Sequence, residues 1–243
     1  MIAIIDYGMG NLRSVAKALE SLGAEIKVTA SPAIIKKASG VILPGVGAMP
    51  DAMKALRKAK VISSIKKTIA EDKPFLGICL GLQLLFETSE EGGGCKGLGI
   101  FKGSVPRFNF SQQSTLNNAC PPTFAGRELS TAFKVPHMGW NTIAKTAESS
   151  MLKARCKSKS IQHSASSIQP LSDIPDNSYV YFVHSYYVRP KDKKIIATTT
   201  NYGIEFCSAI AKGNLFACQF HPEKSQIVGL KILKNFIKLC ESA

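Results

Sequence analysis

The segment Phe75-Leu76-Gly77-Ile78-Cys79-Leu80-Gly81 decides the fold class of this chain. Its apolar first half predicts a buried strand over 74–78, and the sequence from Leu80 to about Thr88 predicts a helix that begins at once. Glycines two positions before and after Cys79 permit a tight turn and let the helix pack close to the strand. A cysteine at such a junction, beside the positive end of a helix dipole, is typical of a nucleophile. A buried core cysteine between helix-packing glycines explains this pattern equally well.

Strands and helices alternate through the first half of the chain. Strands are predicted at 2–6, about 24–30 and 41–43, and helices at 12–22 and through 50–71 with a break near Lys60. This alternation favours a mainly parallel sheet flanked by helices. The second half is strand-rich and its short turns favour antiparallel pairing. Its strands are predicted at about 179–183, 195–200, 206–211 and 215–220, followed by a helix from about 226 to 240. We therefore predict one α/β domain over 1–243.

Two polar stretches look like additions to this domain. Residues 109–131 are rich in Ser, Gln, Asn, Pro and Thr without an apolar period, and residues 154–173 are similar. Such composition is typical of mobile surface loops. Loops of this length cost little entropy, so we expect the core to tolerate them.

The chain carries a formal net charge of +14, much of it in predicted helical or loop stretches. A nucleic-acid surface and a solvated basic face both fit such charge. No aromatic-rich binding motif accompanies the lysines, so we predict a solvated face and no nucleic-acid partner. The basic side chains include Lys54, Arg57, Lys58, Lys60, Lys66 and Lys67.

The cysteines, histidines and apolar runs predict neither a metal site nor a membrane span. The seven cysteines include no C-x-x-C pair, and the four histidines do not cluster with cysteines or carboxylates at metal-ligand spacing. The longest apolar runs have strand length. Met1–Asp6 has no basic region and predicts a strand, not a signal peptide. We expect a cytoplasmic protein with reduced thiols, no metal and no cofactor.

A second catalytic candidate, His221-Pro222-Glu223, follows the apolar run 215–220. Proline disfavours a helical conformation for the residue before it, so we expect an extended segment here. Residues two apart in an extended segment project to the same side, which lets Glu223 orient the imidazole of His221. A lone His-x-Glu is more often an exposed pair of side chains without a catalytic role. Together with Cys79, however, it completes the thiol, imidazole and carboxylate that a nucleophilic relay needs.

Glycine-rich turns follow the first and third predicted strands. Pro44-Gly45-Val46-Gly47-Ala48 can turn backbone N–H groups toward a developing oxyanion, although a plain strand-ending turn fits equally well. Gly8-Met9-Gly10-Asn11 resembles the start of a dinucleotide-binding loop. Arg13 stands at the third glycine position and no acidic residue closes the second strand, so we reject a dinucleotide site.

Six segments together resemble the class I, or triad, glutamine amidotransferases. G-I-C-L-G-L-Q (77–83), P-G-V-G (44–47) and F-H-P-E (220–223) resemble the motifs of the whole family. D-Y-G-M-G-N (6–11), P-H-M-G-W-N (136–141) and Y-F-V-H-S-Y-Y-V (181–188) resemble one branch, the glutaminase subunits of imidazole glycerol phosphate synthase in histidine biosynthesis. The resemblance covers nearly the whole chain outside the two polar stretches, and it implies the single-domain fold of that family.

The resemblance implies a cofactor-free hydrolysis of L-glutamine. Cys79 would attack the δ-carbonyl, His221 would take the thiol proton and deliver it to the leaving ammonia, and Glu223 would hold the imidazole. Water would then hydrolyse the glutamyl thioester. The oxyanion would be stabilised by backbone N–H groups among Gly45, Val46, Gly47 and Leu80, and the amino-acid end of glutamine would be held by Gln83, His184, Ser185 and Tyr186.

The resemblance also implies a protein partner. In that branch of the family, ammonia passes to a separate (β/α)₈-barrel cyclase subunit, which makes imidazole glycerol phosphate and an aminoimidazole carboxamide ribotide. The residues that resemble the face toward the barrel are Asn11, Met138, Trp140 and Asn141. For Trp140, the only tryptophan of the chain, plain core packing is an equally good interpretation.

Two other functions fit the same motifs. A paralogous amidotransferase could feed ammonia to another synthase, such as one that modifies a sugar, and the two polar stretches are the best support for this hypothesis. A non-catalytic regulator could also use the scaffold. Such proteins usually lose a member of the triad, whereas this chain keeps all three residues.

Overall fold

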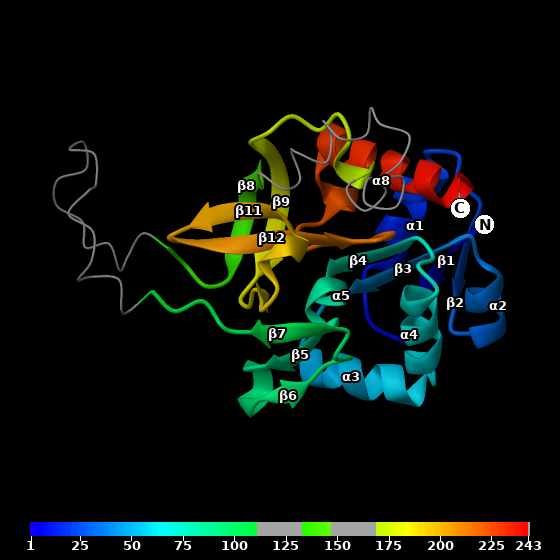
Figure 1. The fold of residues 1–243 in the computed structure, drawn as a ribbon, viewed down its shortest axis with the longest axis horizontal. Helices are drawn as coiled ribbons and strands as arrows, with labels where there is room; N and C mark the ends of the chain where they lie inside the picture. Colours follow the sequence, from blue (N-terminus) through cyan, green and yellow to red (C-terminus); the bar gives the residue numbers. More distant parts are fainter. Residues whose placement is uncertain (111–132, 147–168, 243) are drawn as a thin grey trace, which may run out of the picture.

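The computed structural model describes residues 1–110, 133–146 and 169–242. In this part of the chain, helices cover both faces of a nine-stranded sheet, and a second sheet of four strands lies beside it (Figure 1). The predicted fold class, an α/β fold with a mainly parallel sheet and an antiparallel second half, is confirmed. The nine strands are β1 Ile2–Ile5, β2 Ile26–Thr29, β3 Gly40–Gly45, β4 Phe75–Cys79, β8 His137–Lys145, β9 Ser178–His184, β11 Ile196–Tyr202, β12 Ile204–Lys212 and β13 Leu215–Cys218.

The large sheet changes from parallel to antiparallel pairing part-way across. Its order is β2-β1-β3-β4-β13-β12-β11-β8-β9. The first five strands pair in parallel, and each later neighbour is antiparallel. The parallel strands β3 and β4 are buried along their whole length, as expected for strands covered on both faces. The edge strands of the sheet are β2 and β9.

The helices lie in two layers. In Figure 1, α8 and α1 lie on one side of the parallel strands, and α3 and α4 lie on the other. Their apolar stripes face the sheet; in α1, for example, Val15, Ala16 and Leu19 are buried. The helices are α1 Leu12–Glu20, α2 Pro32–Lys37, α3 Met49–Lys58, α4 Ile62–Ala70, α5 Leu80–Gln83 and α8 Gln226–Glu241.

The small sheet has the order β10-β7-β5-β6. Its strands are β5 Phe86–Ser89, β6 Cys95–Lys96, β7 Phe101–Val105 and β10 Arg189–Pro190. The short 3-10 helices of the chain are η1 Glu91–Gly93, η4 Gln169–Leu171, η5 Lys193–Ile195 and η6 Pro222–Lys224. Phe86 and Phe101 pack against one another at 6.0 Å between ring centroids and join the core below the large sheet.

One of the element predictions is wrong. The helix predicted from Leu80 to about Thr88 ends at Gln83, and the chain continues as β5. Leu84 and Leu85 in the turn and Phe86 in β5 are all buried, and a short buried apolar run fits a helix or a strand equally well, so its hydrophobicity did not distinguish the two states. Strand β8 was not predicted at all, because Gly139 and alternating polar residues weaken its apolar signal. The predicted break in the helical region is confirmed, since Lys60 adopts φ +56° between α3 and α4.

Most of both polar stretches lies outside the described residues, which omit 111–132 and 147–168. The end of the second stretch is described, and there the prediction of a mobile loop is wrong. Pro170 and Leu171 are buried in η4, and the side-chain amide of Asn235 on α8 donates to the carbonyls of Pro170 and Ser172. This segment is therefore anchored on the last helix.

The predicted basic side chains lie on the solvent side of α3 and α4. Lys54, Arg57, Lys58, Lys60, Lys66 and Lys67 are all exposed. No helix in the described part of the chain is both long and apolar enough to cross a bilayer.

Candidate active site

Cys79 occupies a strained turn between β4 and α5. Its backbone has φ +54° and ψ −107°, a conformation that non-glycine residues rarely adopt. Gly81 permits the turn, because a Cβ at this position would stand 1.9 Å from the carbonyl oxygen of Leu43. Gly77 is also crowded, since its Cβ would stand 2.9 Å from that of Ala217. The two glycines let α5 cross directly over the neighbouring strands, and the turn presents the thiol at their carboxyl ends.

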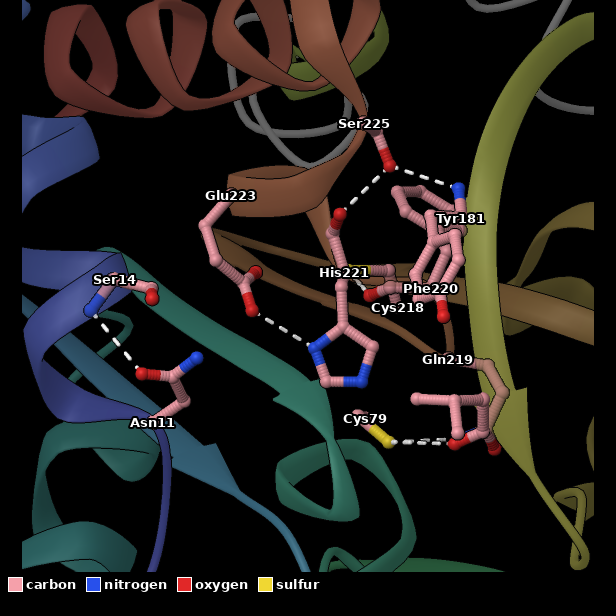
Figure 2. Close-up of polar contacts among 11 residues, drawn as sticks. Asn11, Ser14, Cys79, Tyr181, Cys218, Gln219, Phe220, His221, Glu223 and Ser225 are labelled. Carbon is pink, nitrogen blue, oxygen red and sulfur yellow. Dashed lines mark hydrogen bonds and ion pairs between the residues drawn. The ribbon is translucent and has the colours of Figure 1, made fainter. Parts of the chain in front are cut away.

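His221 and Glu223 meet Cys79 from the end of β13. Because β13 pairs in parallel with β4, its chain leaves the sheet at the same edge. His221 Nδ1 lies 2.8 Å from Glu223 Oε1, and both side chains are almost completely buried. The imidazole points toward the Cys79 sulfur in Figure 2. The three residues of the predicted triad therefore come together.

The route by which Glu223 reaches the imidazole differs from the predicted one. His221 is extended, with φ −101° and ψ 95°, but Pro222 begins the 3-10 helix η6 and Glu223 lies inside it. The pairing thus comes from one turn of 3-10 helix and not from the alternation of an extended segment. Proline favours this start because its fixed φ suits the first helical position.

The charges around His221 favour its protonated form. Burial alone lowers the pKa of His221, but the adjacent Cys79 sulfur and the Glu223 carboxylate raise it to about 10. Nδ1 of His221 is engaged by Glu223, which leaves Nε2 to face the sulfur. Nε2 is buried and makes no hydrogen bond to the described part of the protein. The geometry therefore places a protonated imidazole beside the Cys79 sulfur.

Ser225 fixes the backbone of His221 against the edge strand β9. Its hydroxyl donates to the His221 carbonyl at 2.7 Å and accepts from the backbone N–H of Tyr181 at 2.9 Å. The N–H of His221 in turn donates to the Tyr181 carbonyl at 2.9 Å. These contacts, visible in Figure 2, tie His221 to β9. Sequence reasoning assigned no role to Ser225, because a serine after a turn gives no distinctive signal.

A cavity of about 230 Å³ opens beside the Cys79 thiol. It contains most of the residues predicted for the oxyanion and the substrate, and it adds Glu91 from η1. Its lining residues are Val46, Gly47, Cys79, Leu80, Gln83, Glu91, Val183, His184, Ser185, Tyr186 and His221. Gly45 is not among them, since it pairs with Cys79 inside the sheet.

Tyr7 supports the glycine-rich segment that borders this cavity. Its buried hydroxyl donates to the Pro44 carbonyl at 3.0 Å, and a Cβ on Gly45 would stand 2.5 Å from the same hydroxyl. Burial and the nearby Cys79 raise the pKa of Tyr7, which keeps the hydroxyl protonated as a donor. Gly47 has φ +89°, so the turn after β3 depends on glycine.

Two buried glutamines connect the cavity wall to the thiol. Gln83 Nε2 donates to the Tyr186 carbonyl and to Gln219 Oε1, each at 3.0 Å. Gln219 Nε2 lies 3.5 Å from the Cys79 sulfur and donates to it. Gln219 lies within the apolar run 215–220, and its contact with Cys79 could not be inferred from the sequence alone.

The four residues predicted to face a partner lie in different settings. Met138 and Trp140 project outward from β8, with 63% and 46% of their surface exposed, so the core interpretation of Trp140 is wrong. Asn11 caps α1, where its side-chain oxygen accepts from the Ser14 N–H at 3.3 Å. Asn141 Nδ2 donates to the Asn201 carbonyl at 2.9 Å.

The described residues hold no cluster of three or more His, Cys, Asp or Glu side chains arranged as metal ligands. All five cysteines in the described part of the chain carry free thiols: Cys79, Cys95, Cys207, Cys218 and Cys240. The site thus offers a thiol, an imidazole and a carboxylate beside a substrate-sized cavity.

Comparison of the sequence with known proteins identifies the family of this chain. Residues 3–239 match the family of class-I glutamine amidotransferases. The chain belongs to that family. Among its relatives, the imidazole glycerol phosphate synthase subunit HisH of Geobacter metallireducens is 45% identical over 235 residues, covering 97% of this chain and 96% of the relative. The protein of the same name from Caldanaerobacter subterraneus subsp. tengcongensis is 46% identical over 239 residues, covering 97% of each.

Solved structures of more distant proteins share the fold. A chain in the structure of PurLQS from Thermotoga maritima has a TM-score of 0.60 at 15% identity, and the match covers 99% of this chain and 97% of that one. The glutaminase domain of Trypanosoma brucei CTPS, solved with acivicin bound, has a TM-score of 0.59 at 15% identity, with 99% and 93% covered. At these identities the likeness concerns the fold alone.

Proposed function

We propose that this amidotransferase is the glutaminase subunit of an imidazole glycerol phosphate synthase. It hydrolyses L-glutamine to glutamate and ammonia and supplies the ammonia for histidine biosynthesis. The observation that carries the proposal is the approach of His221 and Glu223 to the strained Cys79 at one cavity, in a chain about 45% identical to synthase subunits of that name.

The reaction proceeds through a thioester on Cys79. The thiolate attacks the δ-carbonyl carbon, and the C–N bond breaks once His221 has given its proton to the leaving ammonia. The imidazole then takes a proton from water, whose oxygen attacks the thioester and frees glutamate and the thiol. Glu223 accepts the Nδ1–H of His221 throughout, and this contact keeps Nε2 turned toward the reacting atoms.

The oxyanion forms beside backbone N–H groups at the cavity wall. Leu80 contributes the N–H that follows the nucleophile at the start of α5, where the helix dipole adds positive potential. Val46 and Gly47 contribute from the turn after β3, and Tyr7 steadies that turn through the Pro44 carbonyl. Gly45 acts indirectly, as the residue whose missing side chain lets the turn pass close to Tyr7.

The amino-acid end of glutamine is held by the opposite wall. Both N–H groups of the Gln83 amide donate within the protein, so its oxygen is the atom left to accept from the substrate's ammonium group. The carboxylate of Glu91 adds negative charge at the same wall. His184, Ser185 and Tyr186 complete it.

The partner is a cyclase subunit with a (β/α)₈-barrel fold, to which ammonia passes without release. The outward surface of β8 and β9 is the proposed docking face, because Met138, Trp140 and Tyr179 expose large apolar area there and single exposed apolar patches of this kind mark interfaces. Asn11 and Asn141 are also assigned to the partner interface in this proposal. The whole chain acts as one domain in the cytoplasm, where a thiol nucleophile stays reduced.

A glutamine-mimicking electrophile tests the chemistry. In the presence of the cyclase, mass spectrometry of peptides should find the covalent adduct on Cys79, and glutamine should protect against it. An unlabelled Cys79 under these conditions would favour a non-catalytic regulator on the same scaffold.

Complementation tests which pathway receives the ammonia. The wild-type gene should restore growth of a histidine auxotroph that lacks its own glutaminase subunit, on medium low in ammonium, and the Cys79→Ala variant should not. A wild-type chain that is labelled by the electrophile but fails to restore growth would point to a paralogue that serves another synthase.

A further inference from the structure

Two buried histidines outside the triad form a direct contact between β8 and the cavity wall. His137 Nδ1 lies 3.0 Å from His184 Nε2, and both side chains are buried. Each ring also contacts a second group, and the chemistry of that group decides whether it donates or accepts. His184 Nδ1 lies 2.8 Å from the Tyr186 carbonyl, and Asn141 Nδ2 lies 3.3 Å from His137 Nε2. None of the steps of glutamine hydrolysis uses these rings as a base or an acid.

The cavity end of this contact determines which nitrogen of His184 carries the proton. A carbonyl oxygen can only accept, so the contact with the Tyr186 carbonyl requires a proton on Nδ1 of His184. In a neutral ring, Nε2 of His184 is then an acceptor. His137 must therefore donate to it from Nδ1.

The β8 end leads independently to the same arrangement. The Asn141 amide is oriented by two backbone groups, because its nitrogen donates to the Asn201 carbonyl and its oxygen accepts from the Thr142 N–H at 2.8 Å. Its second N–H is thus directed at His137 Nε2, which must accept. A neutral His137 that accepts at Nε2 carries its proton on Nδ1, as the cavity end requires.

Burial keeps both rings neutral, as this arrangement needs. It lowers the pKa of His137 to about 4. It lowers the pKa of His184 to about 3, even though the Tyr186 carbonyl acts in the opposite direction. A second proton on His184 would set two N–H groups against one another across 3.0 Å, and a second proton on His137 would face the Asn141 N–H across 3.3 Å.

The chain of hydrogen bonds continues past Tyr186 to the nucleophile. The Tyr186 carbonyl accepts from both His184 and Gln83. Gln83 then orients Gln219, whose amide nitrogen donates to the Cys79 sulfur. Each donor in this series is fixed by the acceptor that follows it. Moving the proton of either histidine to its other ring nitrogen would therefore break hydrogen bonds of this series, among them the contact between His137 and His184.

We propose that His137 and His184 are positioning residues for glutamine hydrolysis, whose fixed tautomers hold the Tyr186 carbonyl against Gln83. Through Gln83 and Gln219 this arrangement orients the donor to the Cys79 sulfur. The inference rests on the proposed glutaminase function. It adds a path from the outward-facing strand β8 to the thiol that is separate from the contacts of Ser225 with β9.

Two amide substitutions at position 137 test this role. His137→Asn places its amide nitrogen where Nδ1 lies and can still donate to His184. His137→Gln places its amide at the position of Nε2, so it can still contact Asn141 but cannot donate to His184. The two variants share the same functional group and the same loss of the ring, which makes each the control for the other.

Activity should depend on whether the side chain at position 137 can donate to His184, and not on the stability of the fold. His137→Asn is expected to retain most of the wild-type kcat/KM for glutamine, whereas His137→Gln should lose roughly tenfold, the effect of one lost hydrogen bond. The rate at which iodoacetamide alkylates Cys79, followed on peptides, should fall in parallel, and this readout needs neither glutamine nor a partner. Equal losses in the two variants at equal melting temperatures would overturn the proposal.

The tautomers can be observed in the wild-type protein, so the test survives a variant that fails to fold. Nitrogen-15 spectra of histidine-labelled protein should show His137 and His184 as neutral rings protonated at Nδ1 from pH 5.5 to 8.5. A ring of His184 protonated at Nε2 would contradict the arrangement. If the wild-type chain shows no glutaminase activity, the proposed function fails; if it is active and the spectra differ, only the positioning role fails.

Discussion

At the scale of single residues, the proposed chemistry depends on the groups that contact the Cys79 sulfur. Gln219 Nε2 donates to it, and His221 faces it with a ring whose other nitrogen is held by Glu223. The triad was predictable because a cysteine at a strand–helix junction and a His-Pro-Glu sequence are unusual patterns that support one another. Gln219, Ser225 and Tyr7 were not predictable, because an amide or a hydroxyl gains its role only from the neighbours that folding provides.

The Glu223→Gln variant tests the orientation of the imidazole. A glutamine amide can donate to Nδ1 of His221, which moves the ring proton to Nε2 and leaves no lone pair to accept a proton at the thiol. We expect kcat to fall by roughly 10²- to 10⁴-fold with little change in KM. The exposed Glu205→Gln on β12 is the matched control and should keep wild-type kinetics. A Glu223→Gln variant within twofold of wild type would contradict the assignment.

The raised pKa of His221 makes a pH-dependent contribution to stability. Since its pKa in the fold is about 10 and its ordinary value is 6.5, the imidazolium stabilises the folded state fully below pH 6.5. That contribution disappears as the pH rises through 10. Urea unfolding should therefore show the stability advantage of wild type over His221→Asn shrinking from pH 6.5 to pH 10. An advantage that grows over this range would contradict the assigned pKa.

At the scale of elements, the junction between β4 and α5 sets the geometry of the site. The sequence predicted its position and its glycines correctly, but not the length of the helix that follows. Leu84 and Leu85 form the turn that ends α5, and pairing with β6 and β7 selects the extended conformation of the following residues Phe86–Ser89. Strand β8 could likewise not be predicted from its local sequence, because it forms only through its pairing with β9 and β11.

Gly81→Ala tests the close crossing of α5 over β3. The new Cβ would stand 1.9 Å from a backbone carbonyl, so the helix must shift, and we expect a loss of about 3 kcal/mol or more in the free energy of unfolding. The control Gly23→Ala has φ +81° but no atom within 4 Å of its Cβ, and it should lose only about 1 kcal/mol. Equal losses measured by urea unfolding would show that space at the junction is not limiting.

At the scale of the whole molecule, the large sheet has two dissimilar ends. One end carries β2, and the other carries β8 and β9, whose outward surface exposes Met138, Trp140 and Tyr179 beside the contacts that reach His221 and Cys79. The sequence resemblance predicted Met138 and Trp140 for a surface that faces a partner, but it did not include Tyr179. The pairing of β8 with β9 brings Tyr179 to this surface, since it lies opposite Thr142 in the register.

Trp140→Ala tests whether this surface binds the cyclase. Buried tryptophans at interfaces often contribute about 2 kcal/mol or more, so Kd for the cyclase should rise by roughly 30-fold or more, while stability of the isolated chain changes little. Val28→Ala, at the other edge of the sheet, is the control and should leave Kd unchanged. Titration calorimetry measures both, and an unchanged Kd in Trp140→Ala would place the interface elsewhere.

The most direct test of the proposed function measures glutamine hydrolysis by the purified chain, first alone, then with the barrel cyclase, then with the cyclase and its nucleotide ligand. We predict slow hydrolysis alone and stimulation by roughly 5- to 150-fold when both are present, the usual range of coupling between two sites. The Cys79→Ala variant should remain inactive under all three conditions. Hydrolysis that is never stimulated by the cyclase, or that persists without Cys79, would contradict the proposed function.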